Sequence, residues 1–247
     1  MVTIEKGQLD MDPQQSQTAK TFDEYKDNYS DAVDAAVAFT GLSTDFYTRV
    51  KADYITDLVN AHFGDGLSLS ALDIGCGIGN YHPLLEPKFA KLSGVDVSKE
   101  CVETAKLRNV SVEYKVYDGS LLPYDDASFD IVYTICVMHH VPPLHWPNFA
   151  AEMRRVLRHG GLALVFEHNP RNPLTMRAVN TCPFDKDAVL LRSEKTEQLL
   201  LEAGFVDVSS RFILSVPPAN KFLRRVDQFF GRIPWGGQYY VAAKLST

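Results

Sequence analysis

Short, uninterrupted apolar runs alternate with helix-like stretches over most of the chain beyond residue 69. Five of these runs are typical of buried strands: residues 69–74, 92–97, 110–116, 129–135 and 162–166. Strands that are apolar on both faces and separated by helices indicate a mainly parallel sheet with helices on both sides. Right-handed crossovers then bring the carboxyl ends of the strands to one edge, where ligands bind. The pattern therefore predicts an α/β fold with its functional site at that edge.

Helical spacing and capping residues predict the remaining elements. Ser98 can cap a helix over Lys99–Arg108. Phe149 and Met153 belong to the apolar stripe of another helix, which we expect to stop at Gly160. The elements expected toward the C-terminus are a helix over Ser193–Gly204, strands over Val206–Val216 and Tyr239–Leu245, and a helix over Lys221–Arg232.

The composition divides the chain into three parts. Residues 1–20 are polar with few large apolar groups, which predicts a disordered N-terminus. Residues 21–66 are predicted to form a helical cap. Residues 67–247 are predicted to form the core domain, with insertions on the substrate side near 169–192 and 217–237.

Charge and cysteine content exclude several classes of partner. The net charge of −6 gives no general attraction for nucleic acid, which needs a concentrated basic face. The four cysteines form no CxxC pair, so we expect neither a disulfide framework nor a structural zinc site. Reduced cysteines and the lack of a signal-like or membrane-spanning apolar run suit a cytoplasmic protein. The oligomeric state stays open.

One glycine-rich loop carries the first functional inference. The segment Asp73-Ile-Gly75-Cys-Gly77-Ile-Gly79-Asn80 follows a strand and opens onto a helix. Glycines are needed where backbone approaches a ligand or takes a positive φ. A dinucleotide loop would have a further glycine where Asn80 stands, and a phosphate loop would have Gly-Lys-Ser/Thr. A carboxylate at Asp73 would repel a pyrophosphate, so the loop favours a ligand with a cationic end.

Two more acids end the next two strands. Asp96 ends the second strand, where a carboxylate can accept hydrogen bonds from both hydroxyls of a ribose. Asp118 follows the third strand, where it can accept from an adenine amino group. Three acids at three successive strand ends indicate a nucleoside ligand with a cationic group much more specifically than the loop alone.

This ensemble resembles the class I S-adenosylmethionine-dependent methyltransferases, and in detail their small-molecule branch, the UbiE/UbiG-like or type 11 group. The matching segments are LDIGCGIGN at 72–80, GVDVS at 94–98, DGSLLPYDDASFDIVYT at 118–134, CVMHHV at 136–141 and VLRHGGLALVFE at 156–167. The resemblance implies a Rossmann-like three-layer sandwich with a seven-stranded, mostly parallel sheet whose last strand is antiparallel. It also implies that S-adenosyl-L-methionine is the cofactor.

The resemblance further implies a set of cofactor-binding residues. The acid before the glycines and the loop backbone would hold the amino-acid end, Asp96 the ribose and Asp118 the adenine. Tyr25 and Tyr29 share a helical face that would cover the cofactor, with core packing as the alternative. The expected cofactor contacts are Tyr25, Tyr29, Asp73, Gly75, Cys76, Gly77, Gly79, Asp96, Val97, Asp118, Gly119, Ser120, Ile135 and Cys136.

Histidines at the same edge are candidates for chemistry on the acceptor. His140, after the fourth strand, is favoured as a general base, because a neutral imidazole suits that role near pH 7. His139, His168 and Asn169 are expected to bind the acceptor. A purely structural role is the alternative for each histidine. No metal site is expected, since Glu167 and these histidines show no ligand spacing.

Other functions remain as alternatives at this stage. The chain could bind S-adenosylmethionine or S-adenosylhomocysteine without transferring a methyl group. A nicotinamide-dependent oxidoreductase is disfavoured by Asp73 and the missing glycine. DNA methylation is disfavoured because residues 134–137 lack the Asn/Asp-Pro-Pro-Tyr/Phe segment. The helix over 221–232 could close the pocket, pack on the core or touch a membrane surface.

Overall fold

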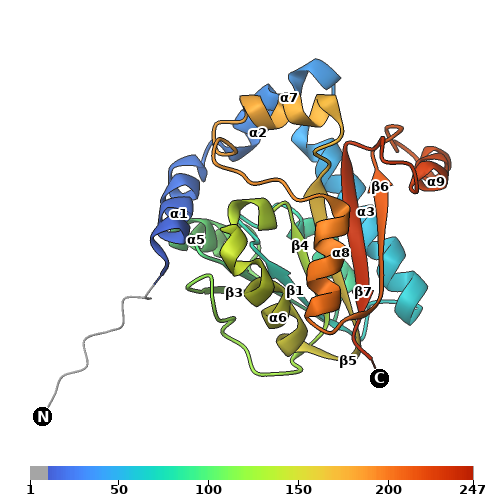
Figure 1. Cartoon of the computed structure of the whole chain (residues 1–247). Coiled ribbons are helices and arrows are strands. Elements are labelled where there is room, and N and C mark those ends of the chain that lie inside the picture. Colours follow the sequence, from blue (N-terminus) through green and yellow to red (C-terminus); the bar gives the residue numbers. More distant parts are fainter. Residues whose placement is uncertain (1–10, 247) are drawn as a thin grey trace, which may run out of the picture.

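A seven-stranded sheet forms the centre of the computed structural model, which describes residues 11–246 (Figure 1). The strand order is β3-β2-β1-β4-β5-β7-β6, and β7 is antiparallel to both of its neighbours while the other pairs are parallel. The predicted sheet with an antiparallel last strand is therefore confirmed. The strands are β1 (Ser70–Ile74), β2 (Lys91–Asp96), β3 (Glu113–Val116), β4 (Phe129–Ile135), β5 (Leu157–His168), β6 (Val206–Ile213) and β7 (Gln238–Lys244).

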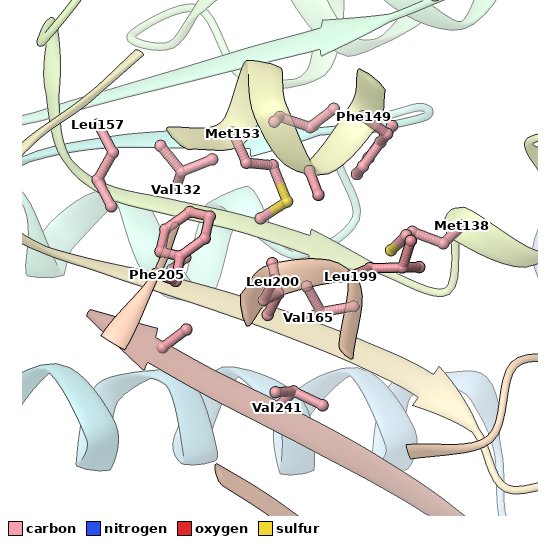
Figure 2. Close-up of a cluster of buried hydrophobic side chains, with 14 of the residues drawn as sticks. Val132, Met138, Phe149, Met153, Leu157, Val165, Leu199, Leu200, Phe205 and Val241 are labelled. Atoms are coloured by element: carbon pink, nitrogen blue, oxygen red, sulfur yellow. The ribbon is translucent and has the colours of Figure 1, made fainter. Parts of the chain in front are cut away.

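Helices cover both faces of this sheet, which completes the three layers. One face packs against α3 (Thr44–Phe63), α4 (His82–Leu85) and α5 (Lys99–Arg108). The other face packs against α6 (Trp146–Val156) and α8 (Ser193–Glu202), and Figure 2 shows Met153 and Leu200 meeting Val132 and Val165 there.

Alternation along the central strands explains the two cores. Ile131 and Tyr133 of β4 lie in the core beside α3, while Val132 lies in the core beside α6 and α8. All three are fully buried. Burial of each large apolar side chain stabilises the fold by about 1.5–3 kcal/mol, so apolar residues on both faces are what a central strand requires.

The chain path sets the position of the ligand site. The chain runs outward from β1 through β2 to β3 and then returns to the other side of β1 as β4. The crevice outside the carboxyl ends of β1 and β4 is therefore the switch point at which open α/β sheets bind ligands.

A roof over this crevice comes from two distant parts of the sequence. The helices α1 (Pro13–Tyr25) and α2 (Tyr29–Val37) meet α7 (Pro173–Thr181) there (Figure 1). Phe184 lies at the centre of the contact and stacks on Tyr29, with ring centroids 5.2 Å apart. The segments 21–37 and 169–192 thus form one roof.

The structure corrects the predicted N-terminal organisation. Residues 13–20 are helical, so the expected disorder is wrong for them; residues 1–10 lie outside the described part of the chain. The helical face through Tyr25 and Tyr29 is split between two helices. The α3 helix is part of the core and does not belong to the cap, because its apolar side packs on the sheet.

Three further boundaries differ from the prediction. β3 starts at Glu113, later than residue 110. The fifth strand starts at Leu157 because that residue pairs with Phe129 of β4, so Gly160 lies inside the strand and does not end the helix. β6 ends at Ile213, before residue 216.

The helix α9 (Lys221–Phe230) packs against the core and does not close the crevice. Its Asp227 is fully buried and accepts a hydrogen bond from the Tyr54 hydroxyl of α3 at 2.7 Å. Its Arg224 pairs with Asp57 of α3 at 3.0 Å. Within residues 11–246, no helix is both long and apolar enough to span a membrane.

Candidate active site

A cavity of about 580 Å³ lies at the carboxyl ends of the strands, beneath the roof. This volume is within the range of small-molecule sites. Most of the predicted site residues line it: Tyr25, Tyr29, Asp73, Gly75, Cys76, Gly77, Asp96, Val97, Gly119, Ile135, Cys136, His139, His140 and His168. The fold thus brings residues from β1, β2, β4, β5 and the roof into one site.

The glycine loop is open to the cavity at Gly77. This residue has a φ of +51°, and a Cβ added to it would meet no atom within 4 Å. Its N–H donates to Oδ2 of Asp96 at 2.8 Å, while Oδ1 of Asp96 accepts from the N–H of Ser98 at 2.8 Å. Ser98 caps α5 as predicted, since its Oγ accepts from the N–H of Cys101. The glycine loop and the Asp96 carboxylate therefore fix each other's position beside the open part of the cavity.

Burial makes the ionised form of Asp96 costly. The side chain is 8% exposed, and burial raises its pKa to about 6, although the hydrogen bonds from Ser98 and Gly77 oppose that rise. Since Asp96 also lines the cavity, hydroxyl donors of a ligand would stabilise its carboxylate further.

Asp73 is held by a histidine that the sequence did not single out. Its Oδ2 lies 3.0 Å from Nε2 of His82, whose other ring nitrogen contacts the Tyr114 hydroxyl. Its Oδ1 is buried and has no hydrogen-bond partner among the described residues. Burial raises the pKa of Asp73, and His82 opposes that rise. In the sequence, the one indication of this role was that His82 lies at the start of the helix that follows the glycine loop.

A buried lysine faces the same part of the cavity. Lys51 of α3 is 5% exposed, and its Nζ lies 3.7 Å from Sγ of Cys136 and 5.7 Å from the centre of the Tyr81 ring. No carboxylate of residues 11–246 forms an ion pair with it. Burial opposes its charge, yet Cys136 and Tyr81 raise the pKa of Lys51. Although burial disfavours a thiolate, Lys51 and His168 lower the pKa of Cys136 to about 7.

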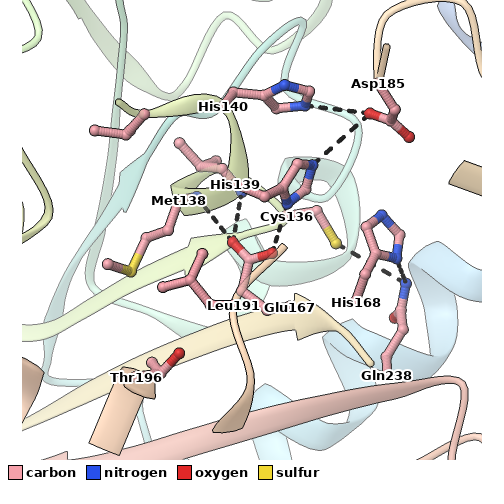
Figure 3. Close-up of polar contacts among 12 residues, drawn as sticks. Cys136, Met138, His139, His140, Glu167, His168, Asp185, Leu191, Thr196 and Gln238 are labelled. Atoms are coloured by element: carbon pink, nitrogen blue, oxygen red, sulfur yellow. Dashed lines mark hydrogen bonds and ion pairs between the residues drawn. The ribbon is translucent and has the colours of Figure 1, made fainter. Parts of the chain in front are cut away.

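Histidines and two carboxylates form another part of the cavity wall (Figure 3). Nδ1 of His139 lies 2.5 Å from Oε2 of Glu167, and Oε1 of Glu167 accepts from the N–H of Met138 at 2.8 Å. On the far side of the rings, Oδ1 of Asp185 lies 3.8 Å from Nε2 of His139 and 3.4 Å from Nε2 of His140. Asp185 follows α7 and was not singled out in the sequence. Its loop lies near the histidines because α7 packs in the roof above them.

Comparison with known proteins agrees with this geometry. Residues 72–165, from β1 to β5, match the methyltransferase domain family of the type 11 branch. This match and the methyltransferases among the relatives below support the class I S-adenosylmethionine-dependent methyltransferase family.

Several curated relatives of this chain are named as methyltransferases. A 24-methylenesterol C-methyltransferase of Oryza sativa subsp. japonica is 29% identical over 76% of this chain and 53% of its own length. An O-methyltransferase of Penicillium expansum is 27% identical over 80% of this chain and 75% of its own. The chain spans about a third to a half of the length of several curated relatives that it matches.

Solved structures share the fold. A SAM-dependent methyltransferase of Thermotoga maritima, described as a possible histamine N-methyltransferase, has a TM-score of 0.63 and 17% identity. The match covers 92% of this chain and 99% of that one. A SAM-dependent methyltransferase of Archaeoglobus fulgidus has a TM-score of 0.60 and 16% identity over 80% of this chain and 94% of that one.

Four of the predicted cofactor and acceptor contacts lie off the cavity wall, and two of them belong to one turn. Oδ1 of Asp118 accepts from the N–H groups of Ser120 and Leu121 at 2.8 and 2.9 Å. One oxygen of this carboxylate therefore stabilises its own turn, and Ser120 is exposed. The expected cofactor contacts through Asp118 and Ser120 stay predictions.

The other two, Asn169 and Gly79, have structural roles. The Asn169 amide donates to the carbonyl oxygens of Gly236 and Pro234 at 2.7 and 3.2 Å, so it anchors the chain before β7. Its contact with an acceptor stays a prediction. A Cβ at Gly79 would lie 2.6 Å from the Tyr114 hydroxyl oxygen. Gly79 is thus needed for packing behind the loop.

Gln15 of α1 is a further cavity residue that the sequence did not reveal. Its side chain is buried, and Nε2 donates to the carbonyl oxygen of Gly119 at 3.1 Å. Gly119 follows the third strand, where the adenine was expected. The roof therefore contributes an amide at the place where the Asp118 carboxylate turns away.

Proposed function

We propose that this methyltransferase transfers the methyl group of S-adenosylmethionine to a small-molecule acceptor. The observation that carries the proposal is the arrangement of charge around one end of the cavity. Asp73 offers an unsatisfied carboxylate oxygen, and Lys51 offers a buried ammonium group without a carboxylate partner among residues 11–246. The amino-acid end of S-adenosylmethionine carries an ammonium and a carboxylate, so the two side chains complement it in sign.

The other cavity groups suit the rest of this cofactor. We assign the ribose hydroxyls to Asp96 and the adenine end to Gly119 and Gln15. The ligand would approach the backbone most closely at Gly77. The carboxylate of Asp73 at the loop would repel a pyrophosphate. These features support S-adenosylmethionine over a nicotinamide dinucleotide.

Bound there, S-adenosylmethionine supplies a methyl group that its sulfonium already activates. The chain's contribution is then to orient both partners and exclude water. The apolar roof of Phe22, Tyr25 and Phe184 closes the cavity above the histidines. We propose that the acceptor lies between this roof and His139, His140 and His168. The role of His140 as general base stays a prediction.

The roof also suggests the class of acceptor. Aromatic side chains favour an apolar, ring-containing molecule with an oxygen, nitrogen or carbon nucleophile. Relatives named for sterol C-methylation and for O-methylation of rifamycin support the same class. The four cysteines are unpaired, in keeping with a reducing, cytoplasmic setting, which we include in the proposal. Contact of residues 221–232 with a membrane surface stays a prediction.

Calorimetry with S-adenosylmethionine, S-adenosylhomocysteine and NADH tests the cofactor, and a labelled-methyl assay with sterol, quinol and phenol acceptors tests the transfer. We expect both sulfur compounds to bind and NADH not to bind. Binding of NADH alone would show the proposal to be wrong. Binding of the sulfur compounds without transfer to any acceptor would favour a non-catalytic binding protein.

The variant Lys51→Met tests the assignment of the cofactor's carboxylate. We expect it to weaken S-adenosylhomocysteine binding about 10- to 100-fold, which is the value of one hydrogen bond to a charged group. The matched control is 5′-methylthioadenosine, which lacks the amino-acid end and should bind the variant and the unmodified chain alike. An equal loss for both ligands would place Lys51 elsewhere than at the carboxylate.

A further inference from the structure

We propose that His139, His140 and Asp185 form a binding site for a divalent transition metal ion, best suited to Zn²⁺, on the acceptor side of the cavity. The three side chains offer two imidazole nitrogens and one carboxylate oxygen, all within 4.8 Å of one another. Such a set is one of the usual arrangements for catalytic zinc, with a fourth position left open. Metal binding here requires no assumption about methyl transfer.

The distances between the donor atoms fit one ion. Zinc bonds of about 2.0–2.1 Å in a tetrahedral site separate neighbouring donors by about 3.3 Å. The separations from Oδ1 of Asp185 are 3.4 Å to His140 and 3.8 Å to His139. All three donor atoms lie within 4.8 Å of one another, so rotations of the side chains would have to close the remaining gap around an ion.

Glu167 orients His139 for this role. Its carboxylate holds Nδ1 of His139 at 2.5 Å and is itself fixed by the N–H groups of Val137 and Met138 at 3.2 and 2.8 Å. In the neutral imidazole the proton then lies on Nδ1, which leaves the lone pair of Nε2 pointing toward Asp185 (Figure 3). A carboxylate behind a metal-binding histidine is the usual outer partner in zinc sites.

The lone pairs on the two histidine Nε2 atoms and on the Asp185 oxygen repel one another unless a cation or a proton lies between them. Nε2 of His139 and Nε2 of His140 both face the same Asp185 oxygen, at ion-pair distances and without a hydrogen bond of good geometry. A bound ion would satisfy all three atoms together. The competing arrangement is a protonated His139 between Glu167 and Asp185, which the test below distinguishes.

The surroundings would keep an ion in place and accessible to an acceptor. His139 and Asp185 are 2% and 8% exposed, and the edge of Phe22 packs on His140 with ring centroids 5.0 Å apart. All three donors line the cavity, so the open position would face it. His168 lies beside His139, but its Nδ1 faces the Gln238 amide at 3.3 Å, and we leave it out of the ligand set.

A role in catalysis rests on the proposed function. An ion here would bind the acceptor's oxygen or nitrogen and lower the pKa of that group, as zinc lowers the pKa of a bound water to about 7, so that its proton would be released to water. His140 would then act as a ligand, and no separate base would be needed. This would favour acceptors with a hydroxyl or amine over those methylated on carbon.

The test uses the full chain, stripped with a chelator and titrated with Zn²⁺ alone by calorimetry and with Co²⁺ alone by visible absorption. We expect one equivalent of each ion to bind. The Co²⁺ spectrum should show the visible bands of a four-coordinate nitrogen and oxygen site, without a thiolate charge-transfer band. Glu167→Gln should weaken binding about 10- to 100-fold, as expected for an outer partner.

Variants of the ligands and a neighbouring control make the test specific. Asp185→Asn and His140→Gln should each abolish stoichiometric binding, and either one suffices if the other fails to fold by circular dichroism. Asp187→Asn, at an exposed carboxylate two residues from Asp185, should bind the ions normally. Binding that persists in both ligand variants, or a thiolate band in the Co²⁺ spectrum, would overturn the site.

The same preparations separate this inference from the proposed function. A folded chain that binds S-adenosylhomocysteine but no metal would overturn the metal site and leave the proposed function intact. The chain could bind no metal and still be stabilised by Asp185. If Asp185→Asn then lowers the melting temperature, the result favours a protonated His139 between Glu167 and Asp185. Metal binding without binding of either sulfur compound would overturn the proposed function alone.

Discussion

At the scale of single residues, Asp96 has both a structural and a ligand-binding position. It accepts hydrogen bonds from Gly77 and Ser98 and also lines the cavity. Its pKa of about 6 lies above the value of 3.8 for an exposed aspartate, because the side chain is buried. Stability is therefore lost as the pH rises through about 6 and the carboxylate ionises, and ligand hydroxyls that donate to the carboxylate would offset that cost.

We predict that S-adenosylhomocysteine binds more weakly as the pH falls below about 6, because a protonated Asp96 accepts fewer hydrogen bonds. Asp96→Asn should weaken binding about 10- to 100-fold at neutral pH and flatten this pH dependence. Calorimetry across the pH range measures both effects. Asp118→Asn is the control, since its carboxylate serves a turn off the cavity wall, and it should leave the pH profile unchanged. A flat profile for the unmodified chain would contradict the ribose assignment.

At the scale of elements, one buried carboxylate joins α9, α3 and the chain after β6. Asp227 accepts from the Tyr54 hydroxyl and from the N–H groups of Leu214, Ser215 and Val216 at 2.7–3.1 Å. Pro217 and Leu214 of this same segment line the cavity. The carboxylate therefore positions part of the cavity wall although α9 itself lies outside it.

We predict that Asp227→Ala lowers the free energy of unfolding by about 3 kcal/mol or more, because it leaves several buried donors unsatisfied. Denaturant unfolding followed by circular dichroism measures the loss. Phe229→Ala on the same helix is the matched control, since Phe229 is 82% exposed, and it should change stability by less than about 0.5 kcal/mol. Equal effects of the two substitutions would argue against the role of Asp227.

At the scale of the whole molecule, the cavity lies between a rigid sheet and a roof built from α1, α2 and α7. Few side chains of the roof contact the sheet side of the cavity. A ligand that contacts both parts should therefore stabilise the roof against the sheet. Gln15 on Gly119 and Phe22 on His140 are two of the contacts between the roof and the rest of the cavity wall.

We predict that S-adenosylhomocysteine at 100 times its Kd stabilises the chain by about 2.7 kcal/mol. For a chain of this length that corresponds to a rise in melting temperature of about 5–10 °C. Hydrogen exchange should show the added protection in α1 and α2 as well as at the glycine loop. NADH serves as the control ligand and should leave both measurements unchanged. Protection confined to the loop would mean that the roof does not close on the cofactor.

The sequence alone determined the sheet, the edge that binds ligands and the cofactor class. These depend on local patterns: strands buried on both faces must be apolar throughout, and a loop that approaches a ligand needs its glycines at fixed spacing. The positions of Asp73 and Asp96 follow because both end a strand, and strand ends meet at one edge whatever the rest of the fold.

Only the tertiary structure decided where side chains point and which distant segments meet. Asp118 and Asn169 lie at the edge of the sheet that binds ligands. The side chain of Asp118 hydrogen-bonds within its own turn, and that of Asn169 hydrogen-bonds to the loop before β7. Lys51 and Asp185 reach the cavity, and His82 reaches Asp73, from segments whose patterns show only helix, loop and helix start. Their approach depends on packing across long sequence separations, which no local periodicity records. The acceptor side of the site is therefore a property of the fold as a whole.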